Sequence, residues 1–280
     1  MPSALEDELG DILQKARDGK SWSPKDLASA TGIPGDEIRR MERYELIPED
    51  AAVKRLAEAL GLHAPSLLAI AREAWKPRPA VTDPAFDLIC LNVFMGSYPV
   101  KCYLLRCGST GATAVVDTGG NPSAVISEAR KIEAKPAMIL LTHCHPDHAG
   151  GQDVLDREFK CPTYVDEKEQ KPPGRRDLRF VADGQVIELG RLSVHVIETP
   201  GHTAGGITYR VNNTLLSGDA IFAGSMGRAN SSWDDLYNSI ATKLFAFPPE
   251  TVIHPGHGPA TTVGEEKLNN PFFAGKLKAE

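Results

Sequence analysis

The chain has 280 residues, of which 41% are hydrophobic and 24% are charged, a composition ordinary for a globular protein of one large or two unequal domains. A net charge of −6 argues against a general affinity for nucleic acid or for anionic membranes. No run of 18 apolar residues occurs, and the first residues, MPSALEDELGD, are acidic. We therefore expect no membrane span or secretory signal and a cytoplasmic location. The five cysteines form no CxxC pair and are expected to be free thiols.

The first part of the chain predicts a small all-helical unit. Apolar residues recur at three- and four-residue spacing in residues 25–30, 36–44 and 51–60, which are separated by glycine and proline. Residues 76–84, KPRPAVTDP, hold three prolines and predict an extended linker. We place a helical domain at residues 1–79.

Residues 80–280 predict an α/β domain. Short apolar runs that predict strands alternate here with turn residues, and two longer segments, 122–132 and 233–245, predict helices between them. The predicted strands are residues 102–105, 113–116, 138–141, 192–197, 214–216 and 251–253.

One short loop concentrates metal-binding side chains. The sequence LLTHCHPDHAGG puts His143, His145, Asp147 and His148 directly after an apolar run that ends at Leu141. Imidazole and carboxylate groups are ligands that zinc and related ions accept, and the end of a buried strand brings them to a place where other elements converge. A solvated polar loop is the alternative, which the HxHxDH arrangement disfavours. Cys144 is predicted to be a packing residue and not a nucleophile.

Three further candidate ligands follow predicted strands. His202 lies in TPGHTAGG, Asp219 in SGDAIF and His257 in HPGHGP. Glycine in each stretch permits a loop that approaches an ion closely. Each residue alone would be interpreted as a polar turn residue, but the three together with residues 143–148 form a pattern.

With these motifs in order, residues 86–273 resemble the metallo-β-lactamase-fold hydrolases, and among them the single-domain type II glyoxalase (hydroxyacylglutathione hydrolase-like) branch. The resemblance rests on VVDTGG, THCHPDHAGG, TPGHTAGG, SGDAIFAGSMGR and HPGHGPATTVGEEKLNNPFF. It implies an αββα sandwich with a dinuclear metal site at one edge.

The resemblance also implies roles for individual residues. His143, His145 and His202 would hold one metal ion, Asp147, His148 and His257 a second, and Asp219 would bridge them. Asp117 would orient a ligand loop. Zinc is expected for both ions, with iron or manganese left open. The best-known subclass of zinc β-lactamases has cysteine at the position of Asp219, which argues against a β-lactam substrate.

The implied chemistry is hydrolysis of an acyl thioester by metal-bound hydroxide. Asp147 and Asp219 would be the catalytic carboxylates, and Asp147 would both ligate a metal and orient the hydroxide. A thiol leaves with little protonation, whereas an amine would need a general acid that the motifs do not supply. Arg228 would bind a substrate carboxylate or phosphate, or is a salt-bridged loop residue. Lactonase, phosphodiesterase and persulfide dioxygenase activities stay open for the same ligand set.

Residues 22–62 resemble the lambda-repressor/Cro type of helix-turn-helix domain. The recognition helix would carry Asp36 and Glu37 at its start, and residues 1–79 hold 12 basic and 14 acidic residues. This charge is unfavourable for binding the phosphates of a DNA duplex. We therefore expect this unit to serve assembly of a homo-oligomer or to shape the active-site entrance. The alternative is a ligand-sensing DNA-binding regulator whose hydrolase domain recognises its effector.

Overall fold

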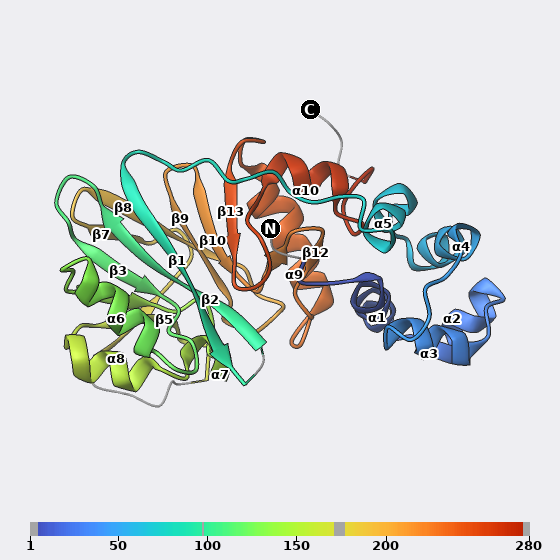
Figure 1. The fold of residues 1–280 in the computed structure, drawn as a ribbon, viewed down its shortest axis with the longest axis horizontal. Coiled ribbons are helices and arrows are strands. Elements are labelled where there is room, and N and C mark those ends of the chain that lie inside the picture. Colours follow the sequence, from blue (N-terminus) through green and yellow to red (C-terminus); the bar gives the residue numbers. More distant parts are fainter. Residues whose placement is uncertain (1–4, 97, 171–176, 277–280) are drawn as a thin grey trace.

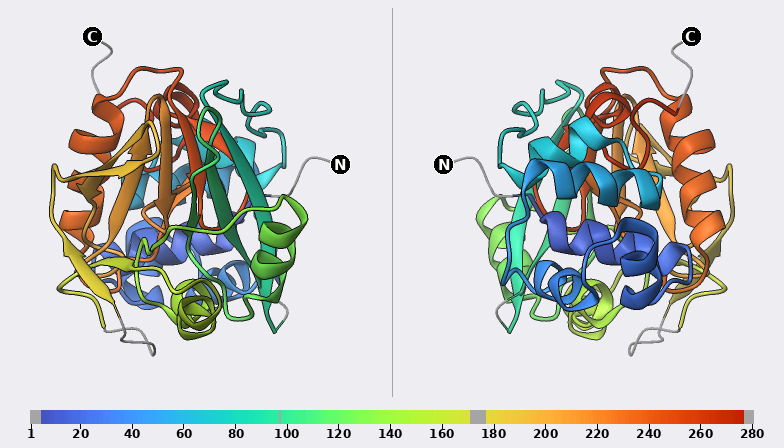
Figure 2. Two further views of the ribbon diagram at one scale, coloured as in Figure 1. Left: turned by 90° about the vertical axis from the view of Figure 1, so that its left-hand side faces the viewer. Right: turned by 90° about the vertical axis from the view of Figure 1, so that its right-hand side faces the viewer.

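Two six-stranded β-sheets packed face to face form the larger part of the molecule (Figure 1). The computed structural model describes residues 5–96, 98–170 and 177–276. Helices cover the outer face of each sheet (Figure 2). The predicted αββα sandwich with an all-helical N-terminal region is confirmed.

The first sheet has the strand order β1-β2-β3-β4-β5-β6. It begins with a long antiparallel hairpin, β1–β2, and continues with parallel pairs from β3 to β6. Strands β3 and β4 are buried on both faces, as expected for parallel strands covered by helices on one side and by a sheet on the other. The strands are β1 (Phe86–Met95), β2 (Tyr98–Cys107), β3 (Thr113–Val116), β4 (Met138–Leu140), β5 (Thr163–Asp166) and β6 (Leu178–Val181).

The second sheet has the order β14-β13-β10-β9-β8-β7. Strand β10 runs parallel to β13 and antiparallel to β9, and β9 runs antiparallel to β8. The carboxyl ends of β8, β10 and β13 therefore lie at one edge. The strands are β7 (Val186–Leu189), β8 (Leu192–Glu198), β9 (Ile207–Val211), β10 (Thr214–Gly218), β13 (Val252–Pro255) and β14 (Thr261–Thr262), and a separate hairpin joins β11 (Ile221–Phe222) to β12 (Ser225–Met226).

Helices complete the outer layers. The first sheet is covered by α6 (Ser123–Lys131) and α8 (Gln152–Phe159), and α7 (Pro146–Ala149) is a single turn after β4. On the other side lie α9 (Trp233–Asn238), a π-helical turn η1 (Ser239–Lys243), a 3₁₀ turn η2 (Leu244–Ala246) and α10 (Val263–Asn269). No helix within the described ranges is long and apolar enough to cross a bilayer.

Five short helices form the N-terminal unit and cover one end of the sandwich (Figure 2). They are α1 (Leu9–Gly19), α2 (Pro24–Thr31), α3 (Gly35–Glu42), α4 (Asp50–Leu60) and α5 (Ala64–Ala71). Helices α2 to α4 correspond to the three predicted segments, whereas α1 and α5 were not predicted. Residues 76–83 contain no helix or strand, as expected for the linker.

The helical unit shares one hydrophobic core with the sandwich. Buried residues of α1 to α5 belong to the same apolar cluster as Leu236, Ile240, Phe272 and Phe273 of the C-terminal part. The backbone N–H of His63 also donates to the carbonyl of Pro271 (2.8 Å). Because the two cores are continuous, the boundary at residue 79 is a boundary in sequence and not in packing, and it stays a prediction as a domain limit.

Candidate metal centre

The candidate ligands converge because each follows a strand that ends at the same edge. Residues 143–148 follow β4, His202 follows β8, Asp219 follows β10 and His257 follows β13. The short helix α7 begins with proline at its first position, which favours a helical start, and it carries Asp147 and His148. The sequence motifs, up to 114 residues apart between His143 and His257, therefore meet in one place.

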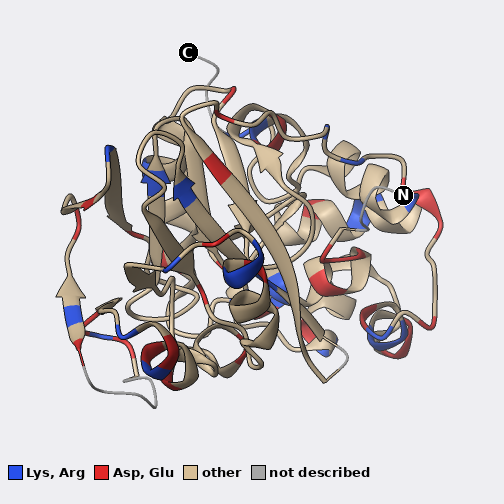
Figure 3. Ribbon diagram, turned by 60° about the vertical axis from the view of Figure 1, so that its left-hand side comes forward, with Lys and Arg blue, Asp and Glu red and all other residues tan. Residues whose placement is uncertain are grey.

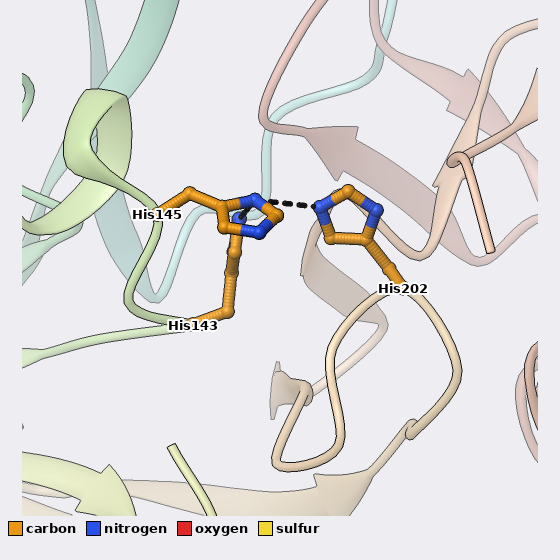
Figure 4. Close-up of side chains that lie close together, drawn as sticks. All are labelled: His143, His145 and His202. Carbon is orange, nitrogen blue, oxygen red and sulfur yellow. Dashed lines mark hydrogen bonds between the residues drawn. The ribbon is translucent and has the colours of Figure 1, made fainter. Parts of the chain in front are cut away.

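The first group of ligand atoms consists of three imidazole nitrogens (Figure 4). His145 Nδ1 lies 3.1 Å from His143 Nε2 and 3.0 Å from His202 Nε2. Nitrogens bound about 2.0–2.1 Å from a tetrahedral zinc ion would lie about 3.3–3.4 Å apart. The spacing of these three rings is therefore close to that of a metal-ligand set.

The second group joins Asp147, His148 and His257. The Nε2 atoms of the two histidines are 3.3 Å apart, and Asp147 Oδ2 lies 3.4 Å from His257 Nε2. Asp219 lies between the two groups, with Oδ1 3.2 Å from His148 Nε2 and Oδ2 3.6 Å from both His202 Nε2 and His257 Nε2. This is the placement expected for a bridging carboxylate.

Three of the rings, those of His148, His202 and His257, form a hydrogen bond through Nδ1 with a group outside the ligand set. These bonds fix how the rings present their Nε2 atoms. His202 Nδ1 lies 2.7 Å from the carbonyl of Arg228, and His257 Nδ1 lies 2.8 Å from the carbonyl of Pro99. Carbonyl oxygens only accept, so each Nδ1 must donate and each neutral ring has its lone pair on Nε2. His148 Nδ1 likewise donates to Asp117 Oδ2 (2.8 Å). In their neutral forms all three rings would turn the Nε2 lone pair toward the space between the ligand groups.

Asp117 has the orienting role that the resemblance implied. Besides accepting from His148, its carboxylate accepts from the backbone N–H of Thr142 (2.8 Å) and from the Thr142 hydroxyl (2.8 Å). It therefore holds both ends of the 142–148 loop, and its backbone adopts a left-handed conformation (φ 56°), which a residue other than glycine adopts at a cost. The prediction for Asp117 is confirmed.

Glu169 is a residue that the sequence analysis missed. Its carboxylate accepts from the backbone N–H of Cys144 (2.8 Å) and from that of Gly205 (3.0 Å). It therefore ties the loop of His143 and His145 to the loop of His202. It lies in a turn outside every motif, so only the folded chain reveals this role. Cys144 itself is half-buried, and burial raises the pKa of its thiol, which agrees with a packing role.

The pKa values of the ligand groups reflect their burial and mutual charge. Burial lowers the pKa of His143 well below its usual value and also lowers that of His202. For His148 burial acts in the same direction, but the carboxylates of Asp219 and Asp117 outweigh it and raise its pKa well above normal. Burial alone would raise the pKa of Asp219, but His148 and its neighbours hold it well below normal. The site thus holds an ionised carboxylate that needs positive charge beside it.

Two further observations fit metal ions. Asp219 Oδ1 is buried and accepts no hydrogen bond from any described residue, an arrangement that costs free energy unless a cation is bound there. Backbone also approaches the site closely at Gly256, where a Cβ atom would lie 2.3 Å from Asp219 Oδ1 and 2.5 Å from His148 Cε1. The histidine and aspartate groups therefore fit a dinuclear site.

Arg228 is placed beside this centre but its guanidinium points to the N-terminal unit. It donates to Asp18 Oδ2 (3.0 Å) and to Gln14 Oε1 (2.8 Å), both on α1. This is the salt-bridged alternative. Substrate binding by Arg228 would require these contacts to open, and it stays a prediction.

The model of the metallo-beta-lactamase superfamily matches residues 95–257, more than half of the chain. The chain belongs to this superfamily. The match begins in β1 and ends at His257, the last candidate ligand, so it contains all seven candidate ligands and excludes the N-terminal helices. Membership in the metallo-beta-lactamase superfamily identifies a hydrolase-type protein with a divalent-metal site.

Similar proteins in the superfamily carry the names of different activities, and one of them is a di-iron form. Hydroxyacylglutathione hydrolase GloC of Haemophilus influenzae is 28% identical over 186 residues, which are 58% of this chain and 88% of GloC. The BLEG-1 B3 metallo-beta-lactamase is 28% identical with a TM-score of 0.61, over 67% of this chain and all of that one. TTHA1623 in a di-iron-bound form is 29% identical with a TM-score of 0.58, over 65% of this chain and all of that one.

Proposed function

We propose that this protein is a metal-dependent hydrolase of acyl thioesters, of the hydroxyacylglutathione hydrolase kind. The observation that carries the proposal is the pair of ligand groups that meet at Asp219, whose buried Oδ1 has no hydrogen-bond donor. His143, His145 and His202 would hold one ion, Asp147, His148 and His257 the other, and Asp219 both. We propose zinc for both ions, and the di-iron form of TTHA1623 keeps iron as the alternative.

When bound, two divalent ions in such a site would activate water at neutral pH and polarise an acyl oxygen. Asp147 supports this chemistry through its own position. It is half-buried, and although burial alone would raise its pKa, the hydrogen bond with His257 holds the pKa below its usual value. It is therefore ionised at neutral pH and able to accept a hydrogen bond from a water between the two ligand groups and so to orient it.

A thioester suits this arrangement because a thiol leaves without much protonation. Among the described residues we assign no side chain as the acid that an amine leaving group would need. The similarity to GloC supports a thioester, whereas that to BLEG-1 requires that β-lactams be tested. Homo-oligomer formation and a cytoplasmic location remain parts of the proposal.

The deciding experiment compares substrates on protein loaded separately with zinc, iron or manganese. The panel contains an acyl-glutathione thioester, a β-lactam, a lactone, a phosphodiester and glutathione persulfide with oxygen uptake recorded. We expect kcat/KM for the thioester to exceed the other values at least tenfold. A higher value for any other substrate, in the best metal form, would contradict the proposed substrate class. His143→Ala measured in parallel excludes a contaminating hydrolase.

A further inference from the structure

Helix α1 of the N-terminal unit reaches the strand that precedes Arg228. Lys15 Nζ donates to the carbonyl of Met226 (2.8 Å) and pairs with the carboxylate of Asp7, which also accepts from the Ser225 hydroxyl. Lys15 and Asp7 are only 7% and 6% exposed. A lysine so deeply buried is retained only with good partners, and one of its two partners here lies 211 residues away in sequence.

The same segment, residues 225–228, supports a candidate metal ligand. The carbonyl of Arg228 accepts from His202 Nδ1 (2.7 Å), and its guanidinium is held by Asp18 and Gln14 of α1. One residue therefore contacts the helical unit through its side chain and the metal centre through its backbone. We call residues 225–228 the backing segment.

The backing segment has no room to shift without disturbing the ligands. A Cβ atom at Gly227 would lie 1.8 Å from the carbonyl oxygen of Asp219 and 3.3 Å from His202 Nδ1. The Gly227 N–H also donates to the carbonyl of Ala220 (3.2 Å). Because the segment packs directly against the bridging carboxylate's residue and against His202, whatever fixes the segment also fixes these two residues.

We propose that Lys15 is a positioning residue for the metal centre. Its contacts hold the backing segment, and the segment fixes the orientation and tautomer of the His202 ring. The N-terminal helical unit is by this account a structural part of the metal site. The inference rests on the proposed metal-binding function, and it concerns metal affinity and not the choice of substrate.

The physical basis is a chain of hydrogen bonds with few alternatives. Without the Lys15 ammonium, the carboxylate of Asp7 and the carbonyl of Met226 lose their charged donor, and the Ser225 hydroxyl, 3.4 Å from that carbonyl, is left as the donor within reach of both. Unpaired buried groups favour a shift toward water. A shift of the backing segment weakens the bond between His202 Nδ1 and the Arg228 carbonyl, and loss of such an outer partner of a ligand costs about 10- to 100-fold in metal affinity.

The test compares two cations of the same helix in the full-length protein. Lys15→Met removes the contact with the backing segment. Arg17→Met is the matched control, because Arg17 is equally buried but pairs with Glu42 and with Asp18 Oδ1 inside the helical unit, and the contact of Arg228 is with the other oxygen, Asp18 Oδ2. Zinc affinity is measured by competition with a chromophoric chelator, and stability by urea unfolding. We expect Lys15→Met to lower the affinity for one of the two zinc ions at least tenfold. Arg17→Met should leave the affinity for both ions within twofold of the wild-type value.

A second pair of variants keeps the test decisive if Lys15→Met does not fold. The double variant Gln14→Ala/Asp18→Ala frees the Arg228 side chain at the surface and should lower the affinity for the same zinc ion a few fold. Lys15→Arg keeps a cation at this position and should retain most of the wild-type affinity. Wild-type zinc affinity in Lys15→Met would overturn this inference and leave the proposed function standing. If Lys15→Met fails to fold, wild-type affinity in the double variant would do the same. Equal losses in Lys15→Met and Arg17→Met would also overturn it. Wild-type protein that retains no metal would overturn the proposed function with it.

Discussion

At the scale of single residues, Asp219 decides whether two ions or one are held. Its Oδ2 lies 3.6 Å from His202 of one ligand group and from His257 of the other, and its buried Oδ1 lies 3.2 Å from His148 and accepts no hydrogen bond from the described residues. It is therefore the carboxylate that we expect to serve both groups.

Asp219→Ala should therefore reduce both metal content and turnover. We expect metal per chain to fall from about two ions to one or none, and kcat/KM to fall by about 100-fold or more, because removing a ligand costs at least as much as removing an outer partner. Metal analysis after gel filtration and a thioester assay measure the two effects. Asp156→Ala, at a buried aspartate of α8, is the control. Unchanged metal content in Asp219→Ala would contradict the dinuclear assignment.

Glu169 provides a second test at this scale. Glu169→Ala should lower metal affinity about 10-fold, because the N–H groups of Cys144 and Gly205 lose their common acceptor and the two histidine loops are no longer tied together. The exposed neighbour Glu167 gives the control variant Glu167→Ala, which should bind metal as wild type does. Chelator competition distinguishes the two. Equal affinities in both variants would assign Glu169 no part in the site.

At the scale of elements, the strands that carry the ligands could be predicted and the contacts of α1 could not. The strand predicted at residues 113–116 has those bounds in the structure, and the predicted strands 138–141 and 192–197 differ from β4 and β8 by one residue. These strands are short apolar runs that end in distinctive motifs, so local pattern is sufficient. Helix α1 also has apolar residues at helical spacing, at Leu9, Ile12, Leu13 and Ala16, but no pattern shows which distant segment it contacts.

The kinetics of an Arg228 variant test whether this side chain binds α1 or the substrate. Arg228→Ala should change KM for anionic and neutral thioesters by the same factor, because its guanidinium is already paired with Asp18 and Gln14. Steady-state kinetics with one substrate of each charge measure this. A rise in KM confined to the anionic substrate would show instead that Arg228 binds the substrate's charge.

Helix α10 holds a buried glutamate that should make stability depend on pH. Glu266 is fully buried, and burial raises its pKa to about 7, although the Thr261, Asn270 and Gly224 donors act in the opposite direction. Since the folded-state pKa lies above the unfolded value, its contribution to stability is complete below about pH 4.5 and is lost as pH rises through about 7.

Urea unfolding between pH 5 and pH 8 measures this effect. The free energy of unfolding of the wild type should fall by on the order of 2 kcal/mol more than that of Glu266→Gln between pH 5 and pH 8. Glutamine keeps an oxygen for the Gly224 and Asn270 donors, and its amide can donate to the Thr261 hydroxyl. Parallel pH dependences in the two proteins would contradict the prediction.

At the scale of the whole molecule, the N-terminal unit shares one core with the sandwich, and its helices carry charges of both signs. Acidic and basic residues are interspersed along its helices (Figure 3). At the start of α3, Asp36 is exposed and paired with Arg39. The similarity of residues 22–62 to helix-turn-helix domains stays a prediction, and DNA binding has little electrostatic support.

The intact protein should accordingly bind duplex DNA weakly, with a Kd above about 10⁻⁴ M at physiological salt, which is the weak end of ordinary non-specific binding. Fluorescence anisotropy with a labelled random-sequence duplex, measured at two salt concentrations, tests this. Selective binding that weakens steeply with salt, found by screening a duplex library, would favour the regulator alternative.

The continuous core also has a consequence for synthesis on the ribosome. Helices α1 to α5 are synthesised before the sandwich, but their buried residues share one apolar cluster with Phe272 and Phe273, which follow α5 by about 200 residues. The helical unit therefore lacks part of its core until residues 272 and 273 have been made, so we expect it not to finish folding before the sandwich as an independent N-terminal domain would. Until then the nascent chain leaves part of this apolar surface uncovered, and we expect chaperones that bind exposed apolar segments to recognise it.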